Sequence, residues 1–598
     1  MSESAHQETP EFDPYSIDRH PPLLRPVIRV KRRAGRVKRW VKRKLYERTI
    51  GREYQAFITA TTDLTVNPPG SVYNAVAVAV IVPVFNPPVD YLRQCLTSVV
   101  QQTAMNWQLV VSDDGSSDPA VLAYLQEFEA EHTDDPRITV VHQPNGGISS
   151  AMNAGLAAVT CEYFGWLDHD DALNPTCMAE VSAALAADTT IDLLYTDEDK
   201  ISPRGEHYEL NCKPDFSPEL LLSQMYLCHF TVFRTELVRN VQGFRSTMDG
   251  AQDYDLVLRI LPNVRGVHHI PRPLYHWRAW SGSTALSIEA KPWAQDVTAR
   301  VQREHLQRTF GGGEVMPSPT QGLNDVHPTV ENTHRVSVII PTIGTPDPRT
   351  GRPLVEAAIA SLRAREHQQT LQVVVVTTGE LPPIPGADRQ VVYRTDSFNF
   401  AEAINLGRQH ADGDYLLLLN DDTSAACDNP VTRMMELGQI DGVAAVGAKL
   451  TYPDGRLQHV GMVLLPSGPT HCWIAKPGKH PGYFGSTLTA RNYSAVTAAA
   501  MLVRTDAFDA VDGFDTKFAR DFNDVDFCLR LRHLGWRMAW TPYAHFVHHE
   551  GATMARKRSD SGEAQLFNQR WAELVTGSTD PYYSPALHAD LRRIYEPR

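Results

Sequence analysis

Hydrophobic residues gather twice along the chain into β-branched runs that end at a proline. VAVAVIVPVFNPP fills residues 76–88 and RVSVIIPTIGTPDP fills residues 335–348. Continuous apolar runs of this length are typical of strands buried on both faces of a parallel sheet. Each run is followed by a stretch with helical spacing and then by a second apolar run, at 107–118 and 371–382. The alternation predicts an α/β fold with a mostly parallel sheet, built twice.

The repeat continues beyond these strands. Each half contains an Asn-x-Gly segment, an apolar run ending in acids (LDHDD or LNDD), an Asp-x-Asp before a helix (QDYD or NDVD) and a late histidine, in this order. A stretch rich in glycine, proline and polar residues separates the halves and is typical of a linker. We therefore predict a disordered N-terminus at 1–24, a basic helical segment at 25–72, domains at 75–310 and 335–575, a linker at 311–334 and a tail at 576–598.

Composition limits the class of protein. The chain has 598 residues, of which 42% are hydrophobic and 21% charged, as in soluble globular proteins, and its length suggests more than one domain. It contains no run of 18 apolar residues, so we expect no membrane-spanning helix. Its N-terminus lacks the apolar core of a secretory signal, so we expect no signal peptide. The eight cysteines are scattered without a CxxC pair. Reduced thiols in a cytoplasmic protein are therefore expected.

Charge is distributed unevenly. The net charge is −13, yet residues 25–52 hold 13 Lys or Arg against one acid, Glu47. Apolar residues recur there at helical spacing, at Val30, Ala34, Val37, Val41 and Leu45. A basic amphipathic helix is typical of a membrane-surface anchor, and a solvated helix packed on an acidic domain is the alternative. Nucleic acid is a third reading, but the acidic remainder argues against it, and we predict no nucleic-acid partner.

Three aspartates follow the apolar run FGWLDHDD so closely that their charges repel one another. A divalent cation would offset the repulsion at Asp168, Asp170 and Asp171. A turn and helix N-terminus, where Asp is favoured as a cap, is the alternative. The recurrence of the landmark order in both halves favours the cation.

Taken together, the ordered motifs VIVPVFN, VSDDGSSD, LDHDD and QDYDLVLR, with VIIPT, LLNDDTS, FNDVDFCLRLRHLGW and HHEG in the second half, resemble glycosyltransferase family 2 domains with the GT-A fold. The resemblance covers residues 75–575. It implies transfer of a sugar, hexosyltransferase-type, from a nucleotide-diphosphate donor with inversion at the anomeric carbon.

Donor-binding residues are expected where the motifs meet the carboxyl ends of strands, because parallel α/β sheets bind ligands there. The candidates are Pro83, Phe85, Asp113, Asp114, Asn153, Pro341 and Asn405. DDGS is also ordinary turn chemistry, so the two aspartates have a structural alternative. In the second half Thr377 and Thr378 replace them, which puts its base recognition in doubt.

Metal ligands and a base follow from the resemblance. Mn²⁺ or Mg²⁺ would be held by Asp168, Asp170 and His276 in the first half and by Asn420, Asp422 and His548 in the second, with oxygen ligands suited to such ions. His549 is an alternative to His548, and a buried, hydrogen-bonded histidine is the alternative for His276.

Inverting transfer also needs a base for the acceptor hydroxyl, which we assign to Asp253 and Asp524. Gln252 and Asn523 stand where relatives carry Glu. Helix capping is the alternative role, and Asp255 and Asp526 are second choices.

These expectations describe a bifunctional transferase that extends a cell-surface polysaccharide or lipid-linked glycan, cytoplasmic and peripheral at the inner face of the plasma membrane. The alternative is one catalytic domain beside a donor- or partner-binding module. A silent nucleotide-sugar binding protein and a nucleotidyltransferase are further alternatives. The latter would want a glycine-rich phosphate loop after the first strand, of which the sequence offers little.

Overall fold

The computed structural model describes residues 76–280, 292–549 and 561–588, except positions 319, 321, 332, 333, 349, 396, 578 and 579. The predicted N-terminal segment and the basic helix therefore lie outside the described residues. Among the described helices, none is both long and apolar enough to cross a bilayer. The eight cysteines are all unpaired in this part of the chain.

A nine-stranded sheet forms the first half, with strand order β3-β2-β1-β4-β8-β6-β9-β5 and β7 paired to β6. β1 to β4 run parallel, whereas β8 is antiparallel to β4 and to β6. The strands are β1 Val78–Val84, β2 Trp107–Asp113, β3 Ile138–His142, β4 Tyr163–Trp166, β5 Ala172–Leu173, β6 Ile191–Ile201, β7 His207–Asn211, β8 Thr231–Arg234 and β9 Gly266–Arg278. The helices are α2 Val89–Val100, α3 Pro119–Glu131, α4 Ile148–Ala158, α5 Cys177–Ala187, α6 Pro218–Leu221, α7 Thr235–Asn240, α8 Gln252–Ile260 and α9 Pro292–Phe310.

The second half repeats this plan in a ten-stranded sheet, ordered β14-β13-β12-β15-β22-β17-β23-β16, with β18 on β17 and β21 on β23. Its strands are β12 Arg335–Thr342, β13 Thr370–Thr378, β14 Arg389–Tyr393, β15 Tyr415–Leu419, β16 Thr423–Ala425, β17 Val443–Thr451, β18 Leu457–His459, β21 Arg491–Tyr493, β22 Ala500–Arg504 and β23 Arg537–His548, and β19 Met462–Leu465 pairs separately with β20 Gly468–His471. The helices are α10 Leu354–Arg365, α11 Phe400–Arg408, α12 Pro430–Gly438, α13 Thr505–Ala510, α14 Asn523–His533, α15 Ser561–Arg570 and α16 Ala572–Thr576. The predicted α/β fold is confirmed. Strands at the same place in the two strand orders correspond to each other, as β1 does to β12 and β9 does to β23.

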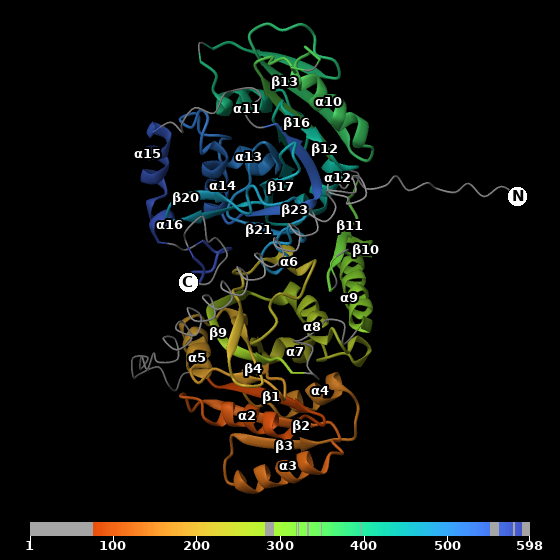
Figure 1. Ribbon diagram of the computed structural model, residues 1–598, viewed down its shortest axis with the longest axis vertical. Helices are drawn as coiled ribbons and strands as arrows, with labels where there is room; N and C mark the ends of the chain where they lie inside the picture. The colour runs from red at the N-terminus through yellow and green to blue at the C-terminus, as the bar shows by residue number, and fades with distance from the viewer. Residues whose placement is uncertain are drawn as a thin grey trace, which may run out of the picture. The chain divides into compact units, whose positions relative to one another are not determined.

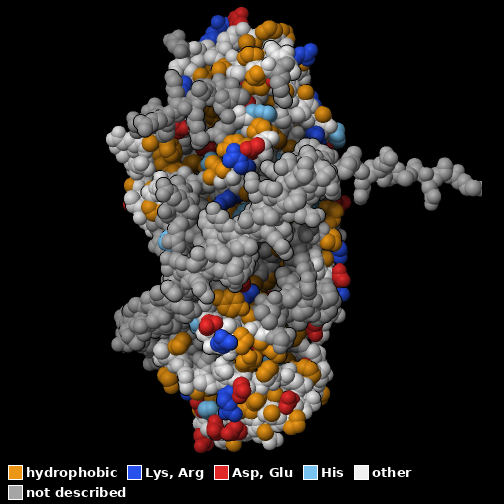
Figure 2. Space-filling view, viewed as in Figure 1, with side chains coloured by type: hydrophobic (Ala, Val, Ile, Leu, Met, Phe, Trp, Pro, Cys, Tyr) orange, Lys and Arg blue, Asp and Glu red, His pale blue; other side chains and the backbone are white. Residues whose placement is uncertain are grey.

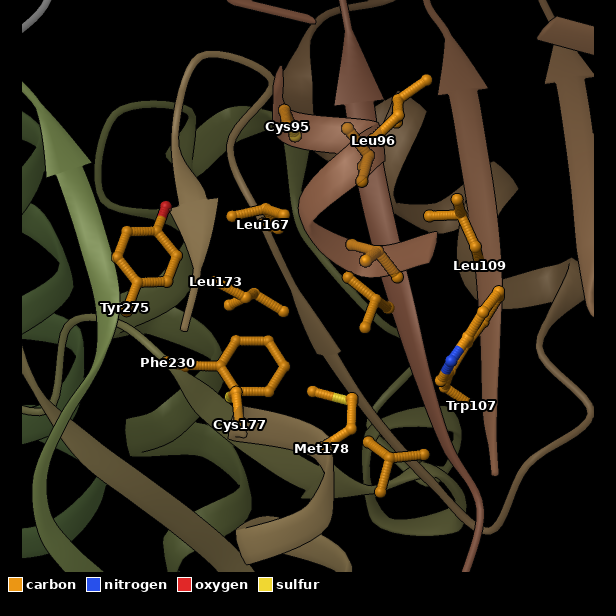
Figure 3. Close-up of a cluster of buried hydrophobic side chains, with 14 of the residues drawn as sticks. Cys95, Leu96, Trp107, Leu109, Leu167, Leu173, Cys177, Met178, Phe230 and Tyr275 are labelled. Atoms are coloured by element: carbon orange, nitrogen blue, oxygen red, sulfur yellow. The ribbon is translucent and has the colours of Figure 1, made fainter. Parts of the chain in front are cut away.

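Burial explains why the apolar runs became central strands. All seven residues of β1 are buried. Val80 and Val82 enter one hydrophobic cluster and Ala79 and Ile81 another, because successive side chains of a strand point to opposite faces. Helices cover both faces, as Figure 1 shows around β1, β2 and β3 (red and orange). Figure 3 shows part of the first cluster, including Leu96 of α2.

The Asn-x-Gly helices pack tightly on the first strand of each sheet. A Cβ on Gly155 of α4 would lie 2.5 Å from Ile81, and one on Gly407 of α11 would lie 2.4 Å from Ile339. Glycine is therefore required by close packing of the helix on the strand, which accounts for its place in both copies of the motif.

Segments outside the two sheets are also ordered. Residues 311–334, predicted as a linker, contain the antiparallel hairpin of β10 (Gly313–Pro317) and β11 (Asn324–Pro328). In the predicted C-terminal tail, buried Asp580 accepts a hydrogen bond from the Leu464 amide. Acidic side chains gather over the exposed face of α3 (Figure 2), which agrees with the negative charge outside the N-terminal segment.

Candidate functional site

The first acidic turn follows β4 and joins it to β5. Asp171 is fully buried and accepts hydrogen bonds from the Tyr275 hydroxyl at 2.5 Å and the Arg278 amide at 2.7 Å. Burial, followed by the charges of Asp170 and Asp168, raises the pKa of Asp171 well above its usual value. Asp171 therefore anchors the turn, while its two neighbours remain half-buried.

Asp168 and Asp170 flank His169 in the turn that follows β4, and each makes a contact to the segment around β9. Trp280 donates to the Asp170 carboxylate at 2.6 Å, and the Asp168 amide donates to the Tyr275 hydroxyl at 3.3 Å. Both residues follow the carboxyl end of a strand that pairs with β1, the edge at which such sheets bind ligands. Carboxylate oxygens at this edge are the kind of ligand that a hard divalent cation prefers.

His276, predicted to complete this metal site, is directed elsewhere. Its Nδ1 lies 2.6 Å from Asp199 of β6, whose other oxygen lies 2.8 Å from Nδ1 of His207. His276 is the strand neighbour of Tyr275, which contacts the acidic turn, so the two side chains point to opposite faces of β9. The group Asp199, His207 and His276 has the geometry to hold an ion of its own, apart from Asp168 and Asp170.

In the second half, the predicted ligands do converge. Nε2 of His548 lies 3.0 Å from Asp422 and 3.3 Å from the Asn420 amide, and Gln458 holds its Nδ1 at 2.8 Å. Carboxylate, amide and imidazole together fit Mn²⁺ or Mg²⁺. A surface pocket beside this cluster is lined by Asp347, Pro348, Leu354, Ala357, Asp421, Asp422, Thr423, Ser424, Tyr452, Pro453 and His549.

The candidate bases begin α8 and α14. Asp253 is half-buried, and burial raises its pKa. Asp524 accepts from the amides of Val525 at 2.9 Å and Ala498 at 3.2 Å. A carboxylate at this place in each half can accept a proton from a hydroxyl.

The second-choice residues are occupied by ion pairs. Asp255 pairs with Arg245 and Arg259, and Asp526 pairs with Arg530 and Arg570. Both are buried, so they serve the packing of the helices that begin with Asp253 and Asp524. The geometry favours the first choices.

Among the residues predicted to bind the sugar donor, one side chain is exposed and two prolines are buried. Phe85 is 47% exposed at the end of β1, open to a ligand. Pro83 is buried, and its carbonyl lies 3.0 Å from Nδ1 of His169. The corresponding Pro341 is also buried, before Thr342, whose hydroxyl donates to Asp421 at 2.6 Å.

Asp114 organises the loop before α4. Its carboxylate accepts from the Gly146 and Gly147 amides and from the side chains of Gln143 and Asn145. Asp113 accepts from Ser116 and contacts His142, raising the pKa of that histidine through their hydrogen bond. The turn alternative therefore describes much of what these two residues do. In the second half, Thr377 donates to the Gly379 carbonyl and forms a similar local turn contact.

Asn153 and Asn405 were expected to bind the donor, but the structure uses their side chains internally. The amide group of Asn153 donates to the carbonyl of Phe244 and accepts from its amide, both within 2.9 Å. Asn405 makes the same pair of bonds to Phe514. Each asparagine thereby ties its helix to the segment leading to the candidate base.

Sequence reasoning missed a buried ionic cluster behind the first acidic turn. The Lys213 ammonium donates to the carbonyls of Thr196, Leu227 and His229 and lies 3.3 Å from Glu198. Burial opposes ionisation of Glu198, but Lys213 outweighs it and holds the pKa at about 2. The available signal was the acidic stretch TDED inside an otherwise buried strand.

His229 belongs to the same cluster. Its Nδ1 lies 3.3 Å from Glu198, and its ring stacks on Tyr275 with centroids 4.5 Å apart. Burial lowers the pKa of His229, but the neighbouring Glu198 carboxylate outweighs this and raises it to about 9. The imidazole thus stands beside the acidic turn, on the ring that bonds to Asp171.

One family model matches part of the first half. Residues 79–241 match the family model described as Glycosyl transferase family 2. The chain is 36% identical over 536 residues to an uncharacterized protein, y4gI, of Sinorhizobium fredii, covering 86% of this chain and 58% of that protein. It is 32% identical to the O-antigen biosynthesis protein RfbC of Myxococcus xanthus, over 85% of this chain and 40% of RfbC.

Other similarities are partial. A chondroitin synthase of Escherichia coli is 30% identical over 42% of this chain and 35% of its own length. The crystal structure of S. aureus TarS 1-349 aligns with 39% of this chain and 72% of its own at 19% identity, with a TM-score of 0.30. The chain thus spans between about a third and three fifths of the length of these three curated relatives.

Proposed function

Since residues 79–241 are a family 2 glycosyltransferase domain, we propose that the chain transfers sugars from nucleotide-diphosphate donors, with inversion and with a divalent metal ion, in both halves. The acceptor is a growing cell-surface polysaccharide or lipid-linked glycan. Similarity to an O-antigen biosynthesis protein and a chondroitin synthase supports an acceptor of this class.

The observation that carries this proposal is the convergence of Asn420, Asp422 and His548 at the carboxyl edge of the second sheet. Asp524 lies in the first turn of α14 in the same half, and its Oδ2 accepts a hydrogen bond from the backbone amide of Ala498. The next residue, Ala499, accepts through its carbonyl from the backbone amide of Asn420. A metal-binding cluster and a proton acceptor are therefore linked through one short segment. This combination suits group transfer from a diphosphate better than simple binding.

Each side chain then has a task. Asn420, Asp422 and His548 hold the metal ion, which supplies neutralisation of charge on the departing diphosphate. Asp524 removes the proton from the attacking hydroxyl. In the first half, Asp168 and Asp170 hold the ion and Asp253 is the base. The raised pKa of Asp253 brings the carboxylate nearer to the basicity that proton removal requires.

The proposed location of the enzyme rests on the sequence of its N-terminal segment. We propose that residues 25–52 hold the enzyme at the inner face of the plasma membrane, where a lipid-linked acceptor is presented. The alternative assignment, one catalytic half beside a donor- or partner-binding module, is separated from this one by the next experiment.

Release of nucleoside diphosphate from UDP-, dTDP- and GDP-sugars is the direct test. We expect Mn²⁺-dependent release from one or two donors, abolished by chelator, because the acidic clusters act through the metal. Asp170→Ala is expected to remove release from one donor and Asp422→Ala from the other. If one variant removes all release, one half alone is catalytic; no release or metal-dependent binding with any donor would refute the donor sites.

A second experiment tests whether His548 is a metal ligand. Gln458 fixes the orientation of His548, so Gln458→Ala is expected to weaken Mn²⁺ affinity about 10–100-fold. The measurement is a Mn²⁺ titration followed by electron paramagnetic resonance. Gln439→Ala, which removes a bond to the Thr329 carbonyl away from the cluster, is the control. Equal affinity in both variants would contradict the assignment of His548 as a ligand.

A further inference from the structure

We propose that the first half binds the donor's diphosphate through His229, which replaces the late-strand histidine used in the second half. Glu198 and Lys213 act as positioning residues for its ring. This inference rests on the proposed function, because it names the group that receives the diphosphate at the first of the two sites.

Strand register shows why β9 cannot supply the imidazole. In the second half, Thr423 pairs with His548, which brings the imidazole to Asp422. In the first half, Asp171 stands at the position of Thr423. Ala172 pairs with His276, so the residue opposite Asp171 is Trp277. A shift of one residue along a strand exchanges its two faces. Trp277, rather than His276, therefore occupies the place of His548.

His229 reaches the same turn from the segment before β8. Its ring lies parallel to Tyr275 within 17°, and the Tyr275 hydroxyl binds Asp171 and the Asp168 amide. The imidazole is thus one aromatic ring away from the acidic turn. Extending the pairing of β8 with β4 places His229 opposite Asp168. Extending the pairing of β22 with β15 places Ala499 opposite Asn420, so Ala499 is the residue of the second half that corresponds to His229. His229 in the first half and His548 in the second therefore approach their acidic turns from different segments.

Glu198 and Lys213 fix the position of His229 through its backbone. The His229 amide donates to Glu198 at 3.0 Å, and its carbonyl accepts from the Lys213 ammonium at 2.6 Å. Nδ1 is shielded from solvent and faces the same carboxylate, while 17% of the side chain remains exposed. The exposed edge is therefore the one that carries Nε2.

The charge of the acidic turn explains why a hydrogen-bond donor is useful there. The first turn carries three carboxylates, Asp168, Asp170 and Asp171, where the second carries two and an asparagine. An imidazole N–H beside the acidic turn can donate to a charged phosphate oxygen, and such charge-assisted bonds are the strong ones.

Two substitutions separate the two ring nitrogens. His229→Asn retains an amide near Nδ1, facing Glu198, but has nothing at the position of Nε2. His229→Gln extends its amide to the position of Nε2. We expect the Asn variant to lose about tenfold in affinity for nucleoside diphosphate and the Gln variant to retain part of it.

The experiment is calorimetric titration of the full chain, with Mn²⁺, against UDP, dTDP and GDP and the monophosphate of the base that binds. All proteins carry His548→Ala to weaken the second site. His268→Gln, at an exposed position of β9, is the matched control. The expected result is a loss confined to the diphosphate in His229→Asn, with monophosphate affinity unchanged.

Three results overturn the inference: an unchanged diphosphate affinity in His229→Asn, an equal loss for monophosphate and diphosphate, or an equal loss in the Asn and Gln variants. The last two would show that His229 only supports the fold. If the parent chain binds none of the diphosphates, the proposed function itself fails. Binding by the parent chain with no effect of His229→Asn refutes this inference alone.

Discussion

Asp524→Asn is expected to slow sugar transfer by the second half about 10²–10⁴-fold. Asn keeps the oxygen that accepts from the Val525 amide, so α14 begins as before, but it cannot take a proton from the acceptor hydroxyl. The measurement is the initial transfer rate with the donor whose release depends on Asp422. Binding of that donor should change little, because the base acts in the chemical step.

Asp506→Asn is the control for this substitution. Asp506 pairs with Arg504 at the surface with 60% of its side chain exposed, so its loss should leave the rate near that of the parent chain. A transfer rate in Asp524→Asn within threefold of the parent would show that another group removes the proton. The equivalent change at Asp253 tests the first half with the other donor.

Lys213→Met is expected to destabilise the first half by about 3–5 kcal/mol, because it removes the ammonium that faces the buried Glu198 carboxylate and leaves only His229 beside that charge. Three carbonyls lose their donor at the same time, while Met preserves most of the volume. The measurement is the guanidinium midpoint of the transition, with nucleotide absent. Adding Glu198→Gln should restore part of the loss, since the uncompensated charge is then removed.

Lys200→Met provides the comparison for this effect. Lys200 bonds to Glu209, whose side chain is 59% exposed, and such pairs contribute about 0.2–1 kcal/mol. Equal shifts in the two Lys variants would contradict the assignment of Lys213 as a buried structural cation. No recovery in the double variant would show that the carbonyl contacts, rather than the charge, dominate.

The fold was predictable because its signal is local. VAVIVPV reads as a strand buried on both faces, and its alternate residues do enter two different hydrophobic clusters. Recurrence of the pattern from residue 335 onward predicted a second copy, and the two sheets share one strand order. The asparagines of the Asn-x-Gly helices were found by the same recurrence, yet their role was not. Asn153 binds the backbone of Phe244, 91 residues away, and no local pattern encodes that partner.

The candidate site was predictable only in part. The acids that follow β4 and β15 were located from their position after apolar runs, and His548 does meet Asp422. His276, predicted to bind the first metal ion, contacts Asp199 instead of the acidic turn, because the spacing of a histidine from a motif does not specify strand register. One residue of register decides which face of β9 it occupies.

The sequence by itself determined the α/β class, the duplication, and the presence of carboxylates at the ends of strands, since each depends on periodicity or on residues adjacent in the chain. Tertiary structure decided which side chains meet. Lys213, Glu198 and His229 come from separate segments and are brought together only by burial, where each charge is stabilised by its neighbours. Register and burial depend on contacts between distant segments, so they become visible only in the folded chain.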